Sequence, residues 1–269
     1  FRSAGDPILY INNPPGVPSN IRRTTLDGLK SLNELNYKQL GDPETHTRIQ
    51  QYELAYRMQS SVPDLTDLSK ETEQTFQLYG EAAKKPGTFA NTALLVRRLV
   101  ERGVRFVQLM HAGWDQHNNL YTQLEAQCRD TEGPSAALVQ DLKERGMLDD
   151  TLIVWGGEFG RTPFGQGDPA QPKGRDHFGK AFSWWLAGGG IKRGSTYGGT
   201  DDFAWNITSN PVHVHDMQAT LLHLCGIDHT RLTFYHDGIR RRLTNVHGRV
   251  IREILADAFP GQFGPLWPR

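Results

Sequence analysis

Apolar positions follow a helical period through the first third of the chain. Residues 22–39 have this spacing, and the leucines at 26, 29, 32, 35 and 40 recur every three to five positions, as on one face of an α-helix. A second helix is predicted over residues 44–62, and Pro63-Asp64 ends it. A looser amphipathic segment follows over residues 64–86. We expect residues 21–86 to form a helical segment that packs on one side of a sheet.

From residue 88 onward, helices alternate with short apolar runs. A helix over Thr88–Arg102 ends at Gly103 and leads into the apolar run Val104–Met110, which is typical of a buried strand. A long helix over Leu120–Arg145 leads in the same way to a strand at Leu152–Trp155. This alternation predicts a parallel sheet with helices on its faces. The remaining predicted elements are strands at Phe182–Ala187 and Val212–Val214 and a helix over Asp216–Cys225.

Composition narrows the class of protein. The hydrophobic content of 37% and charged content of 22% are ordinary for a globular protein, and 269 residues suffice for one large domain or two small ones. Thirty basic residues balance thirty acidic ones, so no nucleic-acid partner is expected, and the run Arg240-Arg241-Arg242 is interpreted as solvated or paired. No apolar run approaches the roughly 20 residues that span a bilayer. Cys128 and Cys225 form no metal-type pair.

Candidate metal ligands stand at the ends of the predicted strands. Asp115 and His117 follow the first strand, Glu158 follows the second, and Asp176-His177 precede the next apolar run. Ligands bind at the carboxyl ends of strands in open α/β sheets. Carboxylate and imidazole together are typical ligands of divalent transition metals. We therefore predict a divalent metal site, with zinc as the first expectation and manganese and calcium as alternatives.

Each of these residues also has a structural interpretation. Glu158 can pair with Arg161, and Asp176 can pair with Arg175 or cap a turn. Both arginines are equally candidates to hold an anionic substrate, because a guanidinium fork matches phosphate and sulfate oxygens.

Three further histidines are candidates for substrate contacts. His213 and His215 alternate around Val214, so on a strand they share one face, either as a metal pair, as a substrate contact or as a polar face near Asp216. His111 is close to Asp115 in sequence and is a candidate to support the site from outside the ligand shell. No nucleophile elbow, phosphate-binding loop or dinucleotide fingerprint occurs in a suitable context, which argues against those three enzyme classes.

Three stretches carry a family resemblance: DDTLIVWGGEFGRTP at 149–163, GRDHFGKAFSWWLAGGGIKRG at 174–194 and PVHVHDMQATLLHLCGIDH at 211–229. They resemble the sulfatase-like family known as domain of unknown function 1501, which is similar to the alkaline-phosphatase superfamily. The resemblance implies a three-layer α/β/α sandwich with a mostly parallel sheet. It also implies that residues 1–269 form one such domain, whose N-terminal strands are missing from this chain.

The same resemblance implies roles for individual residues. Asp115 and His117 match the middle ligand pair of the superfamily, Glu158 matches the later acidic ligand and His177 the final histidine; Asp176 is a further candidate. Phe159 departs from the pattern, because the superfamily often has His or Asn there. The early loop that holds the first metal-binding Asp and the nucleophile is not found, so the nucleophile is expected outside this chain.

The expected function is metal-dependent hydrolysis of phosphate or sulfate esters, with a small molecule or a glycan as the substrate. The sequence does not choose between phosphate and sulfate. The alternative is a catalytically inactive metal-binding or scaffold protein that keeps the fold. Similarity to exported proteins of the family implies a periplasmic or extracellular location.

Overall fold

The computed structural model describes residue 2, residues 5–170 and residues 173–256 of the chain. The chain divides into two compact units. Unit 1 comprises Phe1–His111 and Asp130–Leu138, and unit 2 comprises Ala112–Arg129 and Val139–Arg269. The expectation of a single, N-terminally incomplete domain stays a prediction.

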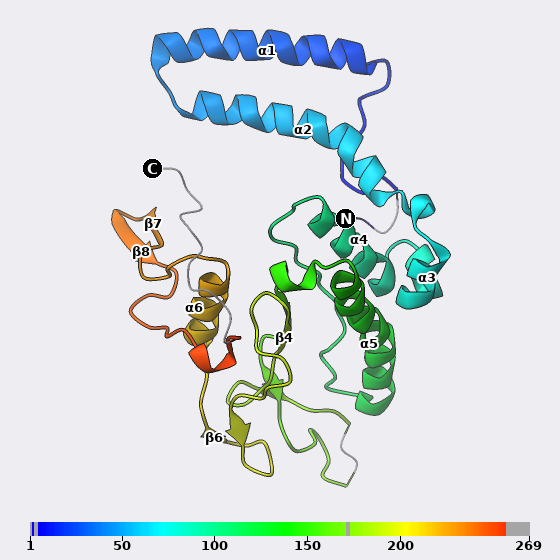
Figure 1. Cartoon of the computed structure of the whole chain (residues 1–269), viewed down its shortest axis with the longest axis vertical. Coiled ribbons are helices and arrows are strands. Elements are labelled where there is room, and N and C mark those ends of the chain that lie inside the picture. The colour runs from blue at the N-terminus through cyan, green and yellow to red at the C-terminus, as the bar shows by residue number, and fades with distance from the viewer. Residues whose placement is uncertain (1, 3–4, 171–172, 257–269) are drawn as a thin grey trace. The chain divides into compact units, whose positions relative to one another are not determined.

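Helices form the regular structure in the described part of unit 1 (Figure 1), and the helical periods of the sequence predicted the main ones. Thr88 caps α4, because its side-chain oxygen accepts a hydrogen bond from the Asn91 amide at 3.1 Å. Gly103, with φ at 78°, follows the end of the same helix. The elements are α1 (Ser19–Leu40), α2 (Glu44–Thr66), η1 (Leu68–Lys70), α3 (Glu73–Tyr79), η2 (Glu81–Lys84) and α4 (Phe89–Glu101).

The first two helices run side by side as a hairpin (Figure 1). Gly41, in the left-handed conformation, ends α1 and donates its amide to the Tyr37 carbonyl. Leu26 of α1 is buried at 4% exposure, whereas Leu35 is 56% exposed and Leu40 79% exposed. The leucine period predicted the helix correctly, although these later leucines are exposed. The expected packing of residues 21–86 against a sheet does not occur inside unit 1, whose described residues contain no strand.

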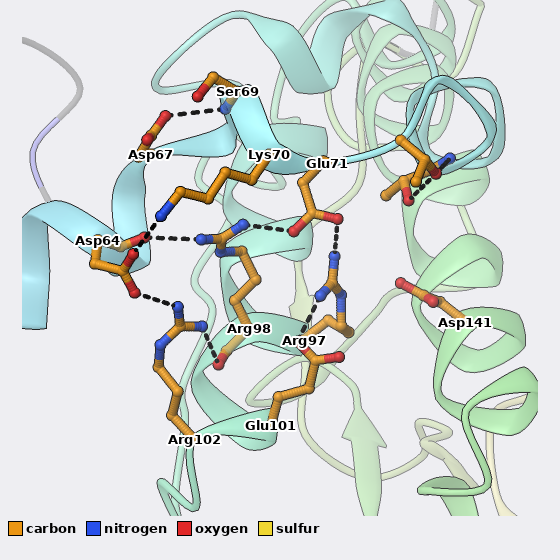
Figure 2. A network of polar contacts seen from close by, with 12 residues as sticks. Asp64, Asp67, Ser69, Lys70, Glu71, Arg97, Arg98, Glu101, Arg102 and Asp141 are labelled. Atoms are coloured by element: carbon orange, nitrogen blue, oxygen red, sulfur yellow. Dashed lines mark hydrogen bonds and ion pairs between the residues drawn. The ribbon is translucent and has the colours of Figure 1, made fainter.

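A buried network of charges ties the end of α2 to α4 (Figure 2). The carboxylate of Glu71 accepts hydrogen bonds from Arg97 and from Arg98, both at 2.5 Å, and the side chains of these three residues are at most 9% exposed. Arg98 also donates to the Asp64 carbonyl at 2.8 Å, and Arg102 pairs with the Asp64 carboxylate at 2.8 Å. Pairing of this kind offsets the cost of removing the charged side chains from water.

Unit 2 combines helices with short strands. Within the described residues, each of these strands belongs to a two-stranded antiparallel sheet: β1 with β4, β2 with β3, β5 with β6 and β7 with β8. The elements are α5 (Leu120–Glu144), which spans both units, η3 (Leu148–Asp150), β1 (Ile153–Trp155), β2 (Gly160–Arg161), β3 (His177–Phe178), β4 (Trp185–Ala187), β5 (Gly199–Thr200), β6 (Ile207–Ser209), α6 (Val214–Leu224), β7 (Thr233–His236), β8 (Ile239–Arg242) and η4 (Arg252–Ile254).

The predicted three-layer sandwich with a mostly parallel sheet is wrong, because its strands do not pair as the alternation of elements implied. The segment Val104–Met110, predicted as a buried strand, is not a strand in the structure. Its Phe106 and Met110 side chains are 83% and 81% exposed. The predicted strand at Leu152–Trp155 exists as β1, but it pairs antiparallel with β4. An apolar run shows that a segment suits a strand; it does not specify the partner.

The predicted strand Val212–Val214 is also wrong, since the chain already enters a helix there. His213 caps α6: its side chain accepts from the His215 amide at 3.2 Å, while the Asp216 carboxylate accepts from the His213 amide at 3.1 Å. This reciprocal capping box begins the helix at Val214, two residues before the predicted start. Among the described residues, no helix is both long and apolar enough to cross a membrane.

Candidate metal centre

Two backbone segments that are distant in sequence meet at the candidate site, within unit 2. The amide of Arg175 donates to the Gln116 carbonyl at 3.1 Å. A Cβ atom at Gly174 would overlap the backbone of Gln116 and His117, so only glycine allows this close approach. β3 begins shortly afterwards at His177, and the contact therefore carries this histidine to the loop that holds His117.

Three potential ligand atoms converge at this point. Nε2 of His117 and Nε2 of His177 each lie 2.9 Å from Oδ1 of Asp115, and the two nitrogens are 3.2 Å apart. Tetrahedral zinc holds ligands at 2.0–2.1 Å, which places neighbouring ligand atoms about 3.3 Å from each other. The triangle of atoms thus has nearly the size of one face of a zinc coordination shell. Two imidazoles and one carboxylate also suit zinc better than calcium, which prefers oxygen ligands.

The group is open on one side. The side chains of Asp115, His177 and His117 are 65%, 48% and 32% exposed. Catalytic zinc sites keep three protein ligands and leave the fourth position for water or substrate, whereas structural sites are closed by four. The arrangement therefore has the form of an open, three-ligand site.

A hydrogen bond to Gln166 determines the tautomer of His117. Nδ1 of His117 lies 2.7 Å from Oε1 of Gln166. Because a carbonyl oxygen can only accept, Nδ1 carries the proton, and in a neutral imidazole Nε2 then presents its lone pair. That lone pair faces Asp115 and His177. Metal-bound histidines are held in this way by an acceptor on the opposite ring nitrogen.

Arg161 of β2 supplies positive charge next to the group. Its Nη2 lies 2.8 Å from Oδ1 of Asp115 and 3.1 Å from the carbonyl oxygen of Trp114. Hydrogen bonds from His177 and from Arg161 lower the pKa of Asp115 to about 2. Asp115 is consequently ionised at neutral pH, as a metal ligand must be.

Phe159 covers one side of His177. The two ring centroids are 4.5 Å apart, and the Arg161 guanidinium lies 5.9 Å from the centre of the Phe159 ring. Phe159 therefore packs against an imidazole of the group and limits its rotation.

The family model described as protein of unknown function (DUF1501) matches residues 1–255. The chain belongs to this family. No curated protein and no solved structure matches the DUF1501 chain.

The other predicted ligands of the DUF1501 chain lie outside this three-residue group. Glu158 is exposed and directly precedes Phe159. Asp176 uses Oδ1 to accept from the His177 amide at 2.8 Å, so it orients the backbone of a ligand instead of adding a ligand atom. The Arg175 guanidinium donates to the Thr162 carbonyl at 3.3 Å, in the turn that follows β2.

The predicted substrate histidines are not in the group either. His111 belongs to unit 1, where its ring meets Phe89 edge-on at 5.2 Å. His213 caps α6, and its ring stacks on His215 at 5.1 Å. The ring of His247 also stacks on that of His215, with the centroids 5.5 Å apart. The alternation around Val214 did bring two imidazoles together, at a helix start and not on a strand.

Gln166 of the DUF1501 chain contacts the group, but no pattern in the sequence indicated it as a site residue. It lies between β2 and β3, and its backbone pairs with Gly174, where its amide donates to the Gly174 carbonyl at 2.7 Å. Glycines at 165 and 167 flank it. These glycines indicate a turn, but they do not indicate that the side chain between them contacts a histidine.

Proposed function

We propose that this chain binds one divalent metal ion, preferably zinc, through Asp115, His117 and His177, and that this centre hydrolyses phosphate or sulfate esters. The observation that carries the proposal is the Gln166–His117 hydrogen bond at 2.7 Å, which turns the lone pair of Nε2 toward the two other ligand atoms.

The reaction class has two supports. A divalent metal at such a centre supplies Lewis-acid activation of water or of an ester oxygen. Arg161 holds the Asp115 carboxylate at 2.8 Å, and its guanidinium provides further donors for the non-bridging oxygens of an anionic ester. The sequence resemblance to sulfatase-like proteins of the alkaline-phosphatase superfamily favours the same class and a location outside the cytoplasm. The sandwich fold that this resemblance implied is not retained.

The second candidate function is metal binding without catalysis. One observation favours it: the Thr162 hydroxyl, which follows β2, donates to the Phe164 carbonyl at 2.9 Å and accepts from the Asp176 amide at 3.1 Å. This hydroxyl is engaged in the loop structure and is not poised as a nucleophile. A nucleophile supplied from outside the chain, or water, would then be needed for turnover.

The two candidates separate in a hydrolysis assay on the zinc-loaded chain with p-nitrophenyl phosphate and p-nitrophenyl sulfate. The proposal predicts zinc-dependent release of p-nitrophenol from one of them. Turnover should be lost in His117→Ala and kept in His236→Ala, which removes an exposed histidine of β7. Stoichiometric zinc binding without turnover would support the second candidate, and failure to bind zinc would contradict both.

A further inference from the structure

The β7–β8 hairpin carries three consecutive arginines. Arg240, Arg241 and Arg242 make no ion pair or hydrogen bond through their guanidinium groups within the described part of the chain. Other surface arginines of unit 2 do: Arg129 pairs with Glu125 at 2.6 Å, and Arg193 pairs with Asp149 at 2.9 Å. Of the two interpretations of this run, solvated or paired, the described residues therefore favour the solvated one.

The register of the hairpin sorts the three arginines onto two faces. Tyr235 is opposite Arg240, and Thr233 is opposite Arg242. Side chains directly across an antiparallel pair share a face, and those of successive residues alternate. Tyr235, Arg240 and Arg242 consequently lie on one face, while Arg241 lies on the other, opposite Phe234.

A hydrogen bond between the two segments that flank the hairpin holds its ends together. At the base, the hydroxyl of the buried Thr244 lies 2.8 Å from Nδ1 of His229. Further out, Tyr235 is 70% exposed. Two guanidinium forks two residues apart on a strand are spaced by about 7 Å, so they meet two separate anionic groups. The exposed Tyr235 ring offers a stacking surface beside them.

We propose that the face formed by Tyr235, Arg240 and Arg242 binds a sulfated or phosphorylated polysaccharide, and that the ester substrate of this protein is such a polymer. The choice of a glycan rests on the proposed function, which already requires phosphate or sulfate esters. Guanidinium forks match the oxygens of both groups. Nucleic acid is the less suitable polyanion, since two arginines supply few of the roughly 6 to 10 phosphate contacts that strong duplex binding uses, and the chain has a formal net charge of +0.

The test is the affinity of the full chain for dextran sulfate as a function of salt concentration. Arg240→Gln with Arg242→Gln should lower the affinity at least tenfold at low salt. The slope of log affinity against log salt should fall by about 2, since each arginine contact accounts for about 1. Arg129→Gln with Arg193→Gln removes the same charge elsewhere in unit 2 and should leave both values unchanged. Arg241→Gln tests the opposite face and should have little effect.

Equal losses in all three variants would mean that net charge alone governs binding, and would overturn the proposed site. Equal affinity of the wild type for dextran sulfate and for polyuridylic acid would overturn the choice of a polysaccharide. Because this binding needs no metal, the result is separable from the proposed function. Face-dependent binding without ester hydrolysis would contradict the hydrolase alone, whereas hydrolysis without binding to dextran sulfate would contradict the hairpin site alone.

Discussion

At the scale of single residues, Gln166 sets the tautomer of His117. Its Oε1 accepts a hydrogen bond from the protonated Nδ1 and leaves Nε2 of His117 directed toward Asp115 and His177. Without this acceptor, the imidazole is free to change tautomer and to rotate. Outer partners of this kind typically contribute 10- to 100-fold to metal affinity.

We therefore expect Gln166→Leu to weaken zinc binding by about 10- to 100-fold, measured by calorimetric titration of the metal-free chain. Gln140→Leu is the matched control, because Gln140 donates to Glu144 on the exposed surface of α5. An affinity of Gln166→Leu equal to that of the control would contradict the role assigned to this side chain.

The sequence identified the three convergent residues but not their support. Asp115 and His117 stood out because they are close in sequence and follow an apolar run, and His177 stood out through its position before another. Glu158 stood out by the same reasoning and is not in the group, because the position of a residue after a strand does not determine where its side chain points. Gln166 gave no signal, since its contact with His117 spans 49 positions.

At the scale of secondary-structure elements, the buried carboxylate of Glu71 holds α4 to the segment after η1. It faces Arg97 and Arg98 at 2.5 Å each, with the three side chains at most 9% exposed. Removing one member of a buried ion pair leaves the remaining charge without compensation.

Glu71→Ala should accordingly lower the free energy of unfolding by about 3–5 kcal/mol, measured by urea denaturation followed by far-ultraviolet circular dichroism. Glu73→Ala is the control: Glu73 pairs with Lys84 on the surface, where its side chain is 65% exposed, and the variant should change stability much less. Similar effects of the two substitutions would show that burial of the network does not govern its contribution.

The end of α2 should respond to acid through Asp64. Hydrogen bonds from Lys70 and from Arg102 lower the pKa of Asp64 from its ordinary value of 3.8 to about 2. The unfolded chain takes up the proton first, so the stabilisation from the ionised carboxylate is complete above about pH 4. It is lost as the pH falls toward 2.

The urea midpoint of the wild type should exceed that of Asp64→Asn at pH 6, and the difference should shrink between about pH 4 and pH 2. Addition of salt at pH 6 should reduce the same difference, because the pair is exposed. A difference that stays constant over this pH range would exclude the Asp64 carboxylate as its source.

Helices could be predicted at this scale because their signals are local. The leucine period of α1 and the Thr88 cap of α4 lie within or next to the helix that they define. Strand pairing is not local. β1 pairs with β4 across some thirty residues, so no signal within either strand specifies the antiparallel register.

At the scale of the whole molecule, this DUF1501 chain has two units, one of which contains the candidate metal group. The order of helices and strands in the sequence suggested a single parallel sheet. Where strands are two to four residues long and pair antiparallel, that order does not determine the architecture. The candidate ligands still converge, because local backbone contacts around Gly174 and the β2–β3 pairing assemble them without a large sheet.

The central claim is that Asp115, His117 and His177 bind one metal ion. The most direct measurement is the zinc content per chain by elemental analysis after dialysis, with wild type beside Asp115→Ala with His117→Ala. The account predicts one zinc per wild-type chain and none in the double variant. Zinc retained by the folded double variant, or no zinc in the folded wild type at saturating concentration, would contradict it.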